Sequence, residues 1–313
     1  MKILTVIALT LLSTPVFAHS GRTDSKGCHT QKSTGIYHCH NSPAPTPVYI
    51  TPPICTNGQV LNAARNTCLN PPPPICTNGQ VLNTARTICV NPPPDVIQLQ
   101  YEGFTIWLDC EKRGAVKFQY NAQHDNGSFP RVESFTLDSN VPVQCQQFKA
   151  QMYGKNYDRG HLVPTNHLDY SATAIKDSNK MTNILPQAAN MNRGAWLQTE
   201  EIIECYRDID ELLVIGGVIW GNNSSDDYFV KSHGVKTPDA YWKVIVRGTS
   251  QSEQTIAWVV PNSKDATRKN LDKYLVTINE IEHLTGEKIP VADYAKDTKP
   301  STSWLIPKGC NKG

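Results

Sequence analysis

Twelve of the 22 prolines in this 313-residue chain fall between Pro43 and Pro94. Several stand in runs such as PPPP (71–74), which favour extended polyproline II spacers over packed structure. The segment 43–94 is therefore predicted to be a stalk. It separates a short arm (19–42) from residues 95–313, which have ordinary composition and are long enough for one sizeable domain with its own core.

The stalk contains a direct repeat, PPICTNGQVLNAARNTCLNPPP and PPICTNGQVLNTARTICVNPPP, with an offset of 21 residues. Each unit (53–70 and 74–91) has two cysteines, and TNG is a turn signal. A unit this small cannot bury a core, so a disulfide must stabilise it. The simplest expectation is that Cys55 pairs with Cys68 and Cys76 with Cys89.

The chain begins MKILTVIALTLLSTPVFA, with one lysine, an apolar run and small residues at 16 and 18. This pattern predicts a signal peptide (1–18), cleaved after Ala18. No stretch approaches the ~18 apolar residues of a membrane helix, so no membrane span is expected. All ten cysteines follow residue 18, and their even number predicts disulfides in an oxidising compartment, either periplasmic or extracellular.

The arm is rich in histidine and cysteine, and several interpretations stay open. The density suits a separate zinc or copper site. Alternatively, Cys28 and Cys39 pair with each other in an oxidising compartment, or the short His-rich arm is disordered. Cleavage after Ala18 would also leave a histidine at the N-terminus, whose amine and imidazole could chelate copper together. The candidate ligands are His19, His29, His38 and His40.

Residues 95–313 predict a mixed α+β domain. Two stretches, 192–209 and 268–286, are predicted helices, and Gly286 suits a helix C-cap. Segments rich in β-branched and aromatic residues are predicted strands. They are FTIWLDC (104–110), VKFQY (116–120), LLVIGGVIWG (212–221), YWKVIVRG (241–248) and TIAWVVP (255–261).

Charge is divided unevenly along the chain. Residues 19–94 carry five basic residues and one acidic residue, whereas 95–313 carry 24 basic and 27 acidic residues, a net charge of −3. A globally basic domain is thereby excluded. If the domain handles a polyanion, binding must come from a local cleft, a metal ion and the basic arm.

The stretch YDRGHLVPTNHLDYS (157–171) is predicted to be a polar turn with a candidate catalytic histidine. His161 can take a proton from water at neutral pH. Arg159 offers a planar fork of donors for phosphate. Asp158 can orient the imidazole or the guanidinium, and Gly160 lets the backbone approach a ligand. Taken alone, a surface histidine is the commoner explanation.

A second stretch, MTNILPQAANMNRGAWLQTEE (181–201), is dense in carboxamides. Amide oxygens are hard ligands that suit Mg²⁺, which keeps most of its waters. Asn192 and Glu200 stand at helical spacing along one side of the predicted helix. The competing explanation for Asn192 is a helix N-cap.

Together the two stretches resemble the DNA/RNA non-specific endonucleases, a family with a ββα-metal site. The resemblance rests on DRGH (158–161) followed by N-x3-Q-x4-N-x-G-x-W-x3-E (183–200). It extends through GVIWG (217–221), AYWKVIV (240–246) and VTINEIEHLTG (276–286), but does not cover the arm or the repeats. It implies a central, mainly antiparallel sheet flanked by helices over 95–313.

The resemblance also implies roles. His161 would be the general base, and Asn192 the one direct protein ligand of Mg²⁺, for which Mn²⁺ can substitute. Glu200 would hold a metal-bound water. The implied reaction is phosphodiester hydrolysis in DNA and RNA, single- or double-stranded, giving 5′-phosphate and 3′-hydroxyl ends. Contacts limited to phosphates would carry little sequence information.

Other positions are less distinctive. The resemblance implies that Asn183 and Gln187 support the site or touch substrate, and that Arg159 meets phosphate. It also implies a further phosphate-binding arginine upstream, for which Arg131 in FPRVESF is at a suitable distance. His167 is interpreted as structural, as is His233.

Cysteine pairing in the domain stays open. Cys310 has three candidate partners, Cys110, Cys145 and Cys205. A second hypothesis for the whole protein is an envelope- or surface-binding protein, in which the repeats and the metal-binding arm act and the nuclease-like domain is a scaffold.

Overall fold

The computed structural model describes residues 22–39, 53–56, 59–61, 67–69, 81–82, 89–90, 95–249 and 251–312. The predicted signal peptide lies outside these residues, as do His19, His40 and Cys76. The chain forms two compact units, 1–72 and 73–313. Within the described residues, no helix has the length and apolar character needed to cross a membrane.

The first unit contains a small ribbon. Strand β1 (Cys28–Thr30) pairs antiparallel with β2 (Tyr37–Cys39), and a disulfide joins Cys28 to Cys39. The expected pairing of Cys28 with Cys39 is therefore confirmed. The two described imidazoles, His29 and His38, face each other across the ribbon with ring centroids 4.6 Å apart.

The first repeat is stapled as predicted, because a disulfide joins Cys55 to Cys68. Its strands β3 (Val60–Leu61) and β4 (Cys68–Leu69) form an antiparallel pair. In the second repeat β5 (Val81–Leu82) pairs with β6 (Cys89–Val90). The predicted Cys76–Cys89 bridge involves a cysteine outside the described residues.

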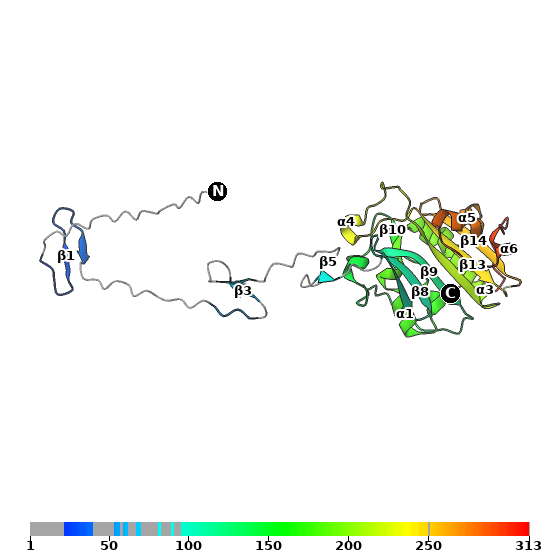
Figure 1. Cartoon of the computed structure of the whole chain (residues 1–313), viewed down its shortest axis with the longest axis horizontal. Helices are drawn as coiled ribbons and strands as arrows, with labels where there is room; N and C mark the ends of the chain where they lie inside the picture. The colour runs from blue at the N-terminus through cyan, green and yellow to red at the C-terminus, as the bar shows by residue number, and fades with distance from the viewer. Residues whose placement is uncertain are drawn as a thin grey trace, which may run out of the picture. The chain divides into compact units, whose positions relative to one another are not determined.

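The second unit is built on a six-stranded sheet in the order β14-β13-β12-β9-β8-β7, drawn in Figure 1. Every neighbouring pair is antiparallel, which confirms the predicted sheet. All five predicted strands are present, and β7 is an additional edge strand. The strands are β7 (Val96–Tyr101), β8 (Phe104–Asp109), β9 (Gly114–Ala122), β12 (Leu212–Ile219), β13 (Ala240–Arg247) and β14 (Gln254–Pro261).

Apolar side chains cover both faces of this sheet, because neighbouring strand residues point to opposite sides. Tyr241 packs on the face that also buries Trp196, whereas the adjacent Trp242 packs on the other face with Ile278 and Ile281. The sheet is therefore the middle layer between two groups of helices. The helical segments of six or more residues are α1 (Ala172–Ser178), α3 (Leu197–Arg207), η5 (Arg268–Tyr274) and α5 (Ile278–Thr285).

The predicted helix over 268–286 is wrong as a single element. A 3₁₀ segment, η5, ends at Tyr274, and the backbone N–H of Val276 donates to the carbonyl of Ala257 on β14 (3.0 Å). Helix α5 then starts afresh with Thr277 as its N-cap. Gly286 ends α5 with φ 74°, so the predicted C-cap is confirmed.

The sequence predicts a turn at the DRGH motif. This prediction is wrong, because the residues of the motif form a strand. Strand β10 (Tyr157–His161) pairs antiparallel with β11 (Ile184–Ala188). Directly after β11 the chain becomes helical through three short elements. They are α2 (Ala189–Met191), the π-helical turn η4 (Asn192–Trp196) and α3.

Two disulfides settle the open cysteine pairing of the domain. Cys110 is bonded to Cys145, and Cys205 on α3 is bonded to Cys310. The second bond ties the segment near residue 310 to the helix that follows the β10–β11 hairpin.

Candidate active site

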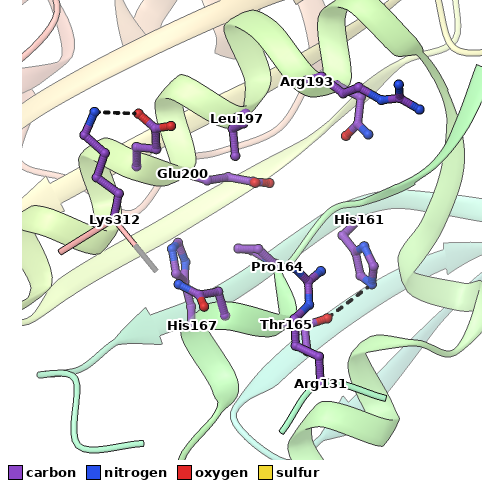
Figure 2. A pocket seen from close by; sticks show the side chains of 12 residues that line it. Arg131, His161, Pro164, Thr165, His167, Arg193, Leu197, Glu200 and Lys312 are labelled. Atoms are coloured by element: carbon purple, nitrogen blue, oxygen red, sulfur yellow. Dashed lines mark hydrogen bonds and ion pairs between the residues drawn. The ribbon is translucent and has the colours of Figure 1, made fainter. Parts of the chain in front are cut away.

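The hairpin and the helix enclose a cavity of about 260 Å³. Figure 2 shows Glu200 and Arg193 reaching from the helix on one side, and Arg131, Thr165 and His161 lying on the other. Four of the sequence-predicted site residues therefore lie together at this cavity: His161, Asn192, Glu200 and Arg131.

Asn179 fixes the tautomer of His161. The amide Nδ2 of Asn179 donates to the carbonyl of Val132, an atom that can only accept. The amide oxygen of Asn179 therefore faces the imidazole, 2.8 Å from Nε2. Since this oxygen is an acceptor, Nε2 must hold the proton. The other ring nitrogen, Nδ1, keeps its lone pair for a proton from water.

A chain of hydroxyl groups reinforces the same tautomer. Ser178 donates its hydroxyl proton to the carbonyl of Ile175 (2.8 Å), so its oxygen accepts from Thr165 (2.9 Å). Thr165 has then used its proton, and its oxygen faces Nε2 of His161 at 3.3 Å as a second acceptor. Neither Asn179 nor Thr165 was identified from the sequence. Asn179 is 18 residues from His161, and Thr165 is only four residues away but lies outside the DRGH motif.

The imidazole of His161 is neutral at neutral pH. Burial lowers its pKa from 6.5 to about 4, and the nearby charges of Arg131 and Arg159 act in the same direction. The hydrogen bond to Asn179 opposes the shift without cancelling it. A neutral imidazole with a free Nδ1 can act as a base over the whole physiological range.

Asn192 is not a helix N-cap, which was the competing explanation. It has helical φ and ψ (−55° and −49°), and the short helix α2 precedes it directly. Its Nδ2 donates to Asp158 (3.0 Å), which leaves its amide oxygen free to act as a ligand.

The predicted role of Asp158 is wrong, because this carboxylate orients neither His161 nor Arg159. It accepts two bonds from Arg193 (2.8 and 2.7 Å) as well as the bond from Asn192.

Glu200 lies further along the same helical segment than Asn192, and the buried cation Lys243 is near its carboxylate. Burial raises the pKa of Glu200, and the charge of Lys243 opposes that rise. Lys243 is fully buried on β13, donates to the hydroxyl of Thr199 (2.8 Å) and lies 3.8 Å from the ring centre of Trp196. A charged partner below the carboxylate favours its ionised form.

The oxygen atoms of Asn192 and Glu200 form a donor set that fits a hard divalent cation such as Mg²⁺. One direct amide ligand, with a carboxylate nearby to hold a bound water, suits an ion that keeps several waters. Over the described part of the chain, no group of three or more His, Cys, Asp or Glu could hold a metal ion. The fit therefore rests on the asparagine.

The two candidate arginines differ in their surroundings. Arg159 does not line the cavity. Its Nη1 donates to the carbonyl of Ala150 (2.9 Å), and its guanidinium carbon stacks 3.7 Å from the ring centre of Phe135. Arg131 does line the cavity, and it makes no hydrogen bond or ion pair with any described residue. The geometry thus favours Arg131 for phosphate and makes Arg159 a packing residue.

Asn183 and Gln187 are fully buried and support the hairpin. Asn183 accepts from the backbone N–H of Val163 (3.0 Å) and donates to the carbonyls of Val163 and Ser178. Gln187 packs against Gly160, where a Cβ would lie 2.2 Å from its side chain. Gly160 therefore makes room for the side chain of Gln187. The prediction that it makes room for a ligand is wrong.

Two further domain histidines, His167 and His233, are buried and hydrogen-bonded. His167 is 2.8 Å from the hydroxyl of Tyr120, and burial lowers its pKa well below 6.5. His233 is bonded to the backbone carbonyl of Gln151 (3.1 Å). These contacts are those of structural residues, although His167 also reaches the cavity wall.

A histidine on a short hairpin, facing amide and carboxylate oxygens on the helix that follows, is the arrangement of a ββα nuclease site. The chain belongs to the DNA/RNA non-specific endonuclease family, because the model of that family matches residues 84–300. The match includes the hairpin, the helix and the whole six-stranded sheet.

Known relatives agree with this assignment. The chain is 27% identical over 166 residues to human "Nuclease EXOG, mitochondrial", covering 49% of this chain and 45% of the relative. It is 28% identical over 171 residues to "Nuclease" from Nostoc sp. (51% and 60%). It is 27% identical over 198 residues to human "Endonuclease G, mitochondrial" (59% and 66%). The chain spans about half the length of the first of these relatives.

A solved structure shares the fold. It is described as "Crystal structure of the EndoG/EndoGI complex: Mechanism of EndoG inhibition". It matches with a TM-score of 0.51 and 19% identity, covering 61% of this chain and 84% of the other chain.

Proposed function

We propose that residues 95–313 hydrolyse phosphodiester bonds in DNA and RNA, single- or double-stranded, with Mg²⁺ or, in its place, Mn²⁺. The products would carry 5′-phosphate and 3′-hydroxyl ends. The observation that supports this most is one cavity that brings together a neutral imidazole of fixed tautomer, an amide oxygen left free when Asn192 donates to Asp158, and an arginine with no hydrogen bond or ion pair to the described residues.

The proposed mechanism assigns a task to each residue. Nδ1 of His161 takes a proton from water, which then attacks phosphorus. Asn192 would be the direct ligand of the cation, and Glu200 would hold one of the waters bound to it. The bound cation would stabilise charge on the phosphate and the leaving 3′ oxygen. Arg131 binds a non-bridging phosphate oxygen and holds the diester in line with the water.

The composition of the cavity wall supports activity on both nucleic acids. Apart from two imidazoles, no aromatic ring lines the cavity within the described residues, so a base has no platform to stack on. Charged and amide groups dominate, and these recognise phosphate. Because phosphate contacts carry little sequence information and the attack needs no 2′-hydroxyl, DNA and RNA should both be cut.

We further propose that the protein is exported, to the periplasm or outside the cell. Support comes from the sequence of residues 1–18 and from four described disulfides, which persist only in an oxidising compartment. The complete catalytic cavity weighs against the second hypothesis, in which the domain is a scaffold. The N-terminal region would then add contacts to the cell envelope or to substrate without replacing the catalytic role.

The test is a cleavage assay with plasmid DNA and with RNA, in Mg²⁺ or in EDTA. Wild type should cut both substrates in Mg²⁺ and neither in EDTA. His161→Ala and Asn192→Ala should each lower kcat by about 10²-fold or more, because each removes a whole catalytic element. His283→Ala, on the exposed side of α5, is the matched control and should cut at the wild-type rate. Equal rates for His161→Ala and wild type would refute the mechanism.

A further inference from the structure

A lysine far from the motifs in sequence lies in the wall of the catalytic cavity. Lys312 lines it together with His161, Asn192 and Glu200. Figure 2 places Lys312 at the far end of the cavity from His161 and Arg193. The resemblance to known nucleases did not point to this residue, because neither matched stretch includes it.

Three contacts hold the segment 304–312, here called the stapled segment, against helix α3. The disulfide Cys205–Cys310 fixes it covalently. The hydroxyl of Tyr206, the next residue on α3, donates to the carbonyl of Leu305 (3.1 Å). The ring of Tyr206 also packs on Trp304, with centroids 5.0 Å apart. Lys312 is therefore placed at the cavity by a built connection to the catalytic helix.

The charge of Lys312 is only loosely neutralised. Its Nζ lies 3.5 Å from Glu201, a longer contact than the two bonds of 2.6 and 2.7 Å that Glu201 accepts from Arg268. Glu201 is thus already paired, and the ammonium of Lys312, with its side chain half exposed, has donors to spare.

The other cations at the cavity provide a contrast. Arg193 is bound through two hydrogen bonds to Asp158, which neutralises it. Arg131 has no such partner among the described residues, and it faces the centre of the cavity in Figure 2. Two cations are therefore available to an anion, Arg131 beside the catalytic histidine and Lys312 at one end.

We propose that Lys312 is a substrate-binding residue, whose ammonium binds a phosphate of the nucleic acid strand next to the scissile phosphate. The inference rests on the proposed nuclease function and adds a second phosphate position to it. A strand that enters the cavity would meet Arg131 at the bond to be cut and Lys312 one or more nucleotides away. A substrate with a single phosphate would meet only Arg131.

The test compares Lys312→Ala with Lys308→Ala, an exposed lysine of the same stapled segment that does not line the cavity. Each is assayed with a single-stranded oligonucleotide and with bis(4-nitrophenyl) phosphate, which has one phosphate. For the oligonucleotide, Lys312→Ala should raise KM by about three- to tenfold. It should also flatten the plot of log(kcat/KM) against log[salt] by about 0.7, the value expected for one lost contact with a single strand. Kinetics with the small diester should not change.

The double variant Cys205→Ser/Cys310→Ser tests the role of the disulfide, at a temperature below its measured Tm. Freed from α3, the stapled segment should lose its phosphate contact, so this variant should show the same reduced salt slope as Lys312→Ala. Adding Lys312→Ala to it should change the slope no further. A wild-type slope in the disulfide variant would show that the segment is held without the bond, and would overturn this part of the proposal.

The failures of the two proposals are distinguishable. If wild type cuts neither substrate, the nuclease function is wrong. If wild type cuts both but Lys312→Ala keeps the wild-type salt slope, or matches Lys308→Ala, the nuclease stands and the phosphate contact of Lys312 is wrong. A loss of activity on the small diester in Lys312→Ala would make the lysine a structural residue and would also overturn the inference.

Discussion

His161 is useful as a base in one tautomer only, and Asn179 selects it. Replacing Asn179 with Asp puts a carboxylate 2.8 Å from Nε2, where it favours the protonated imidazole. An opposite charge this close raises a histidine pKa by about 1–3 units. His161 must be neutral to act, and its wild-type pKa is about 4, so activity fails only as pH falls through that value.

In Asn179→Asp the acid limb of the kcat/KM profile should therefore move to higher pH by about 1–3 units. Asn140→Asp, an exposed change outside the cavity, should leave the profile in place. The measurement is kcat/KM between pH 4 and pH 8. An unmoved acid limb in Asn179→Asp would mean that Asn179 does not control the base.

Substitutions of Arg131 and Arg159 should have different effects on Tm and on kcat/KM. Arg131 makes no hydrogen bond or ion pair with a described residue, so Arg131→Ala should leave Tm unchanged and lower kcat/KM by about 10- to 100-fold, the value of a charge-assisted phosphate contact. Arg159 packs on Phe135 and bonds to Ala150, so Arg159→Ala should lower Tm first. Thermal unfolding and steady-state kinetics on both variants decide the matter. The reverse pattern would return the phosphate role to Arg159.

Among the elements, the π-helical turn η4 determines where Asn192 lies relative to Glu200 on helix α3. It is made at Gly194, where a Cβ would lie 3.0 Å from the carbonyl oxygen of Ala266 and 3.1 Å from Cα of Thr267. Both are backbone atoms, and the same carbonyl accepts from the N–H of Ala195 (3.1 Å). The helix therefore approaches this loop as closely as glycine permits.

Gly194→Ala should push the helix and the 266–268 loop apart. Overpacking of this kind costs about 1–3 kcal/mol of unfolding free energy. Because Asn192 lies in the same turn, the Mg²⁺ concentration for half-maximal activity should also rise. Both effects can be measured by denaturant unfolding and by a Mg²⁺ titration of the cleavage rate. Unchanged values in both would show that the turn tolerates a side chain.

The elements also show what the sequence could and could not predict. Five sheet strands were predicted correctly because β-branched and aromatic residues fill them for packing. Strand β10 was missed because its residues, YDRGH, are polar ones that serve the site and give no apolar alternation. The roles of Asp158 and Asn179 depend on partners 34 and 47 residues away, which spacing along the chain does not encode. His161, Asn192 and Glu200 were found because two motifs fix them together.

At the scale of the whole molecule, charge is divided between the two regions of the chain. Residues 95–313 carry a net charge of −3, whereas 19–94 carry +4 from Arg22, Lys26, Lys32, Arg65, Arg86 and Asp24. A nuclease domain of net negative charge repels its polyanionic substrate at long range. The N-terminal region would offset that repulsion wherever it reaches the same strand.

Deleting residues 19–94 should therefore raise KM for long nucleic acids and flatten the salt dependence of kcat/KM. Each lost phosphate contact lowers the slope of the logarithmic plot by about 0.7–0.9. A full-length variant with the five basic residues changed to Gln is the matched control for charge, since it keeps the disulfides and the length. If charge is the cause, this variant and the deletion should have the same reduced slope, with kcat on bis(4-nitrophenyl) phosphate unchanged. If the neutralised variant keeps the wild-type slope, the N-terminal region does not bind nucleic acid through its charge, and binding rests on the cavity alone.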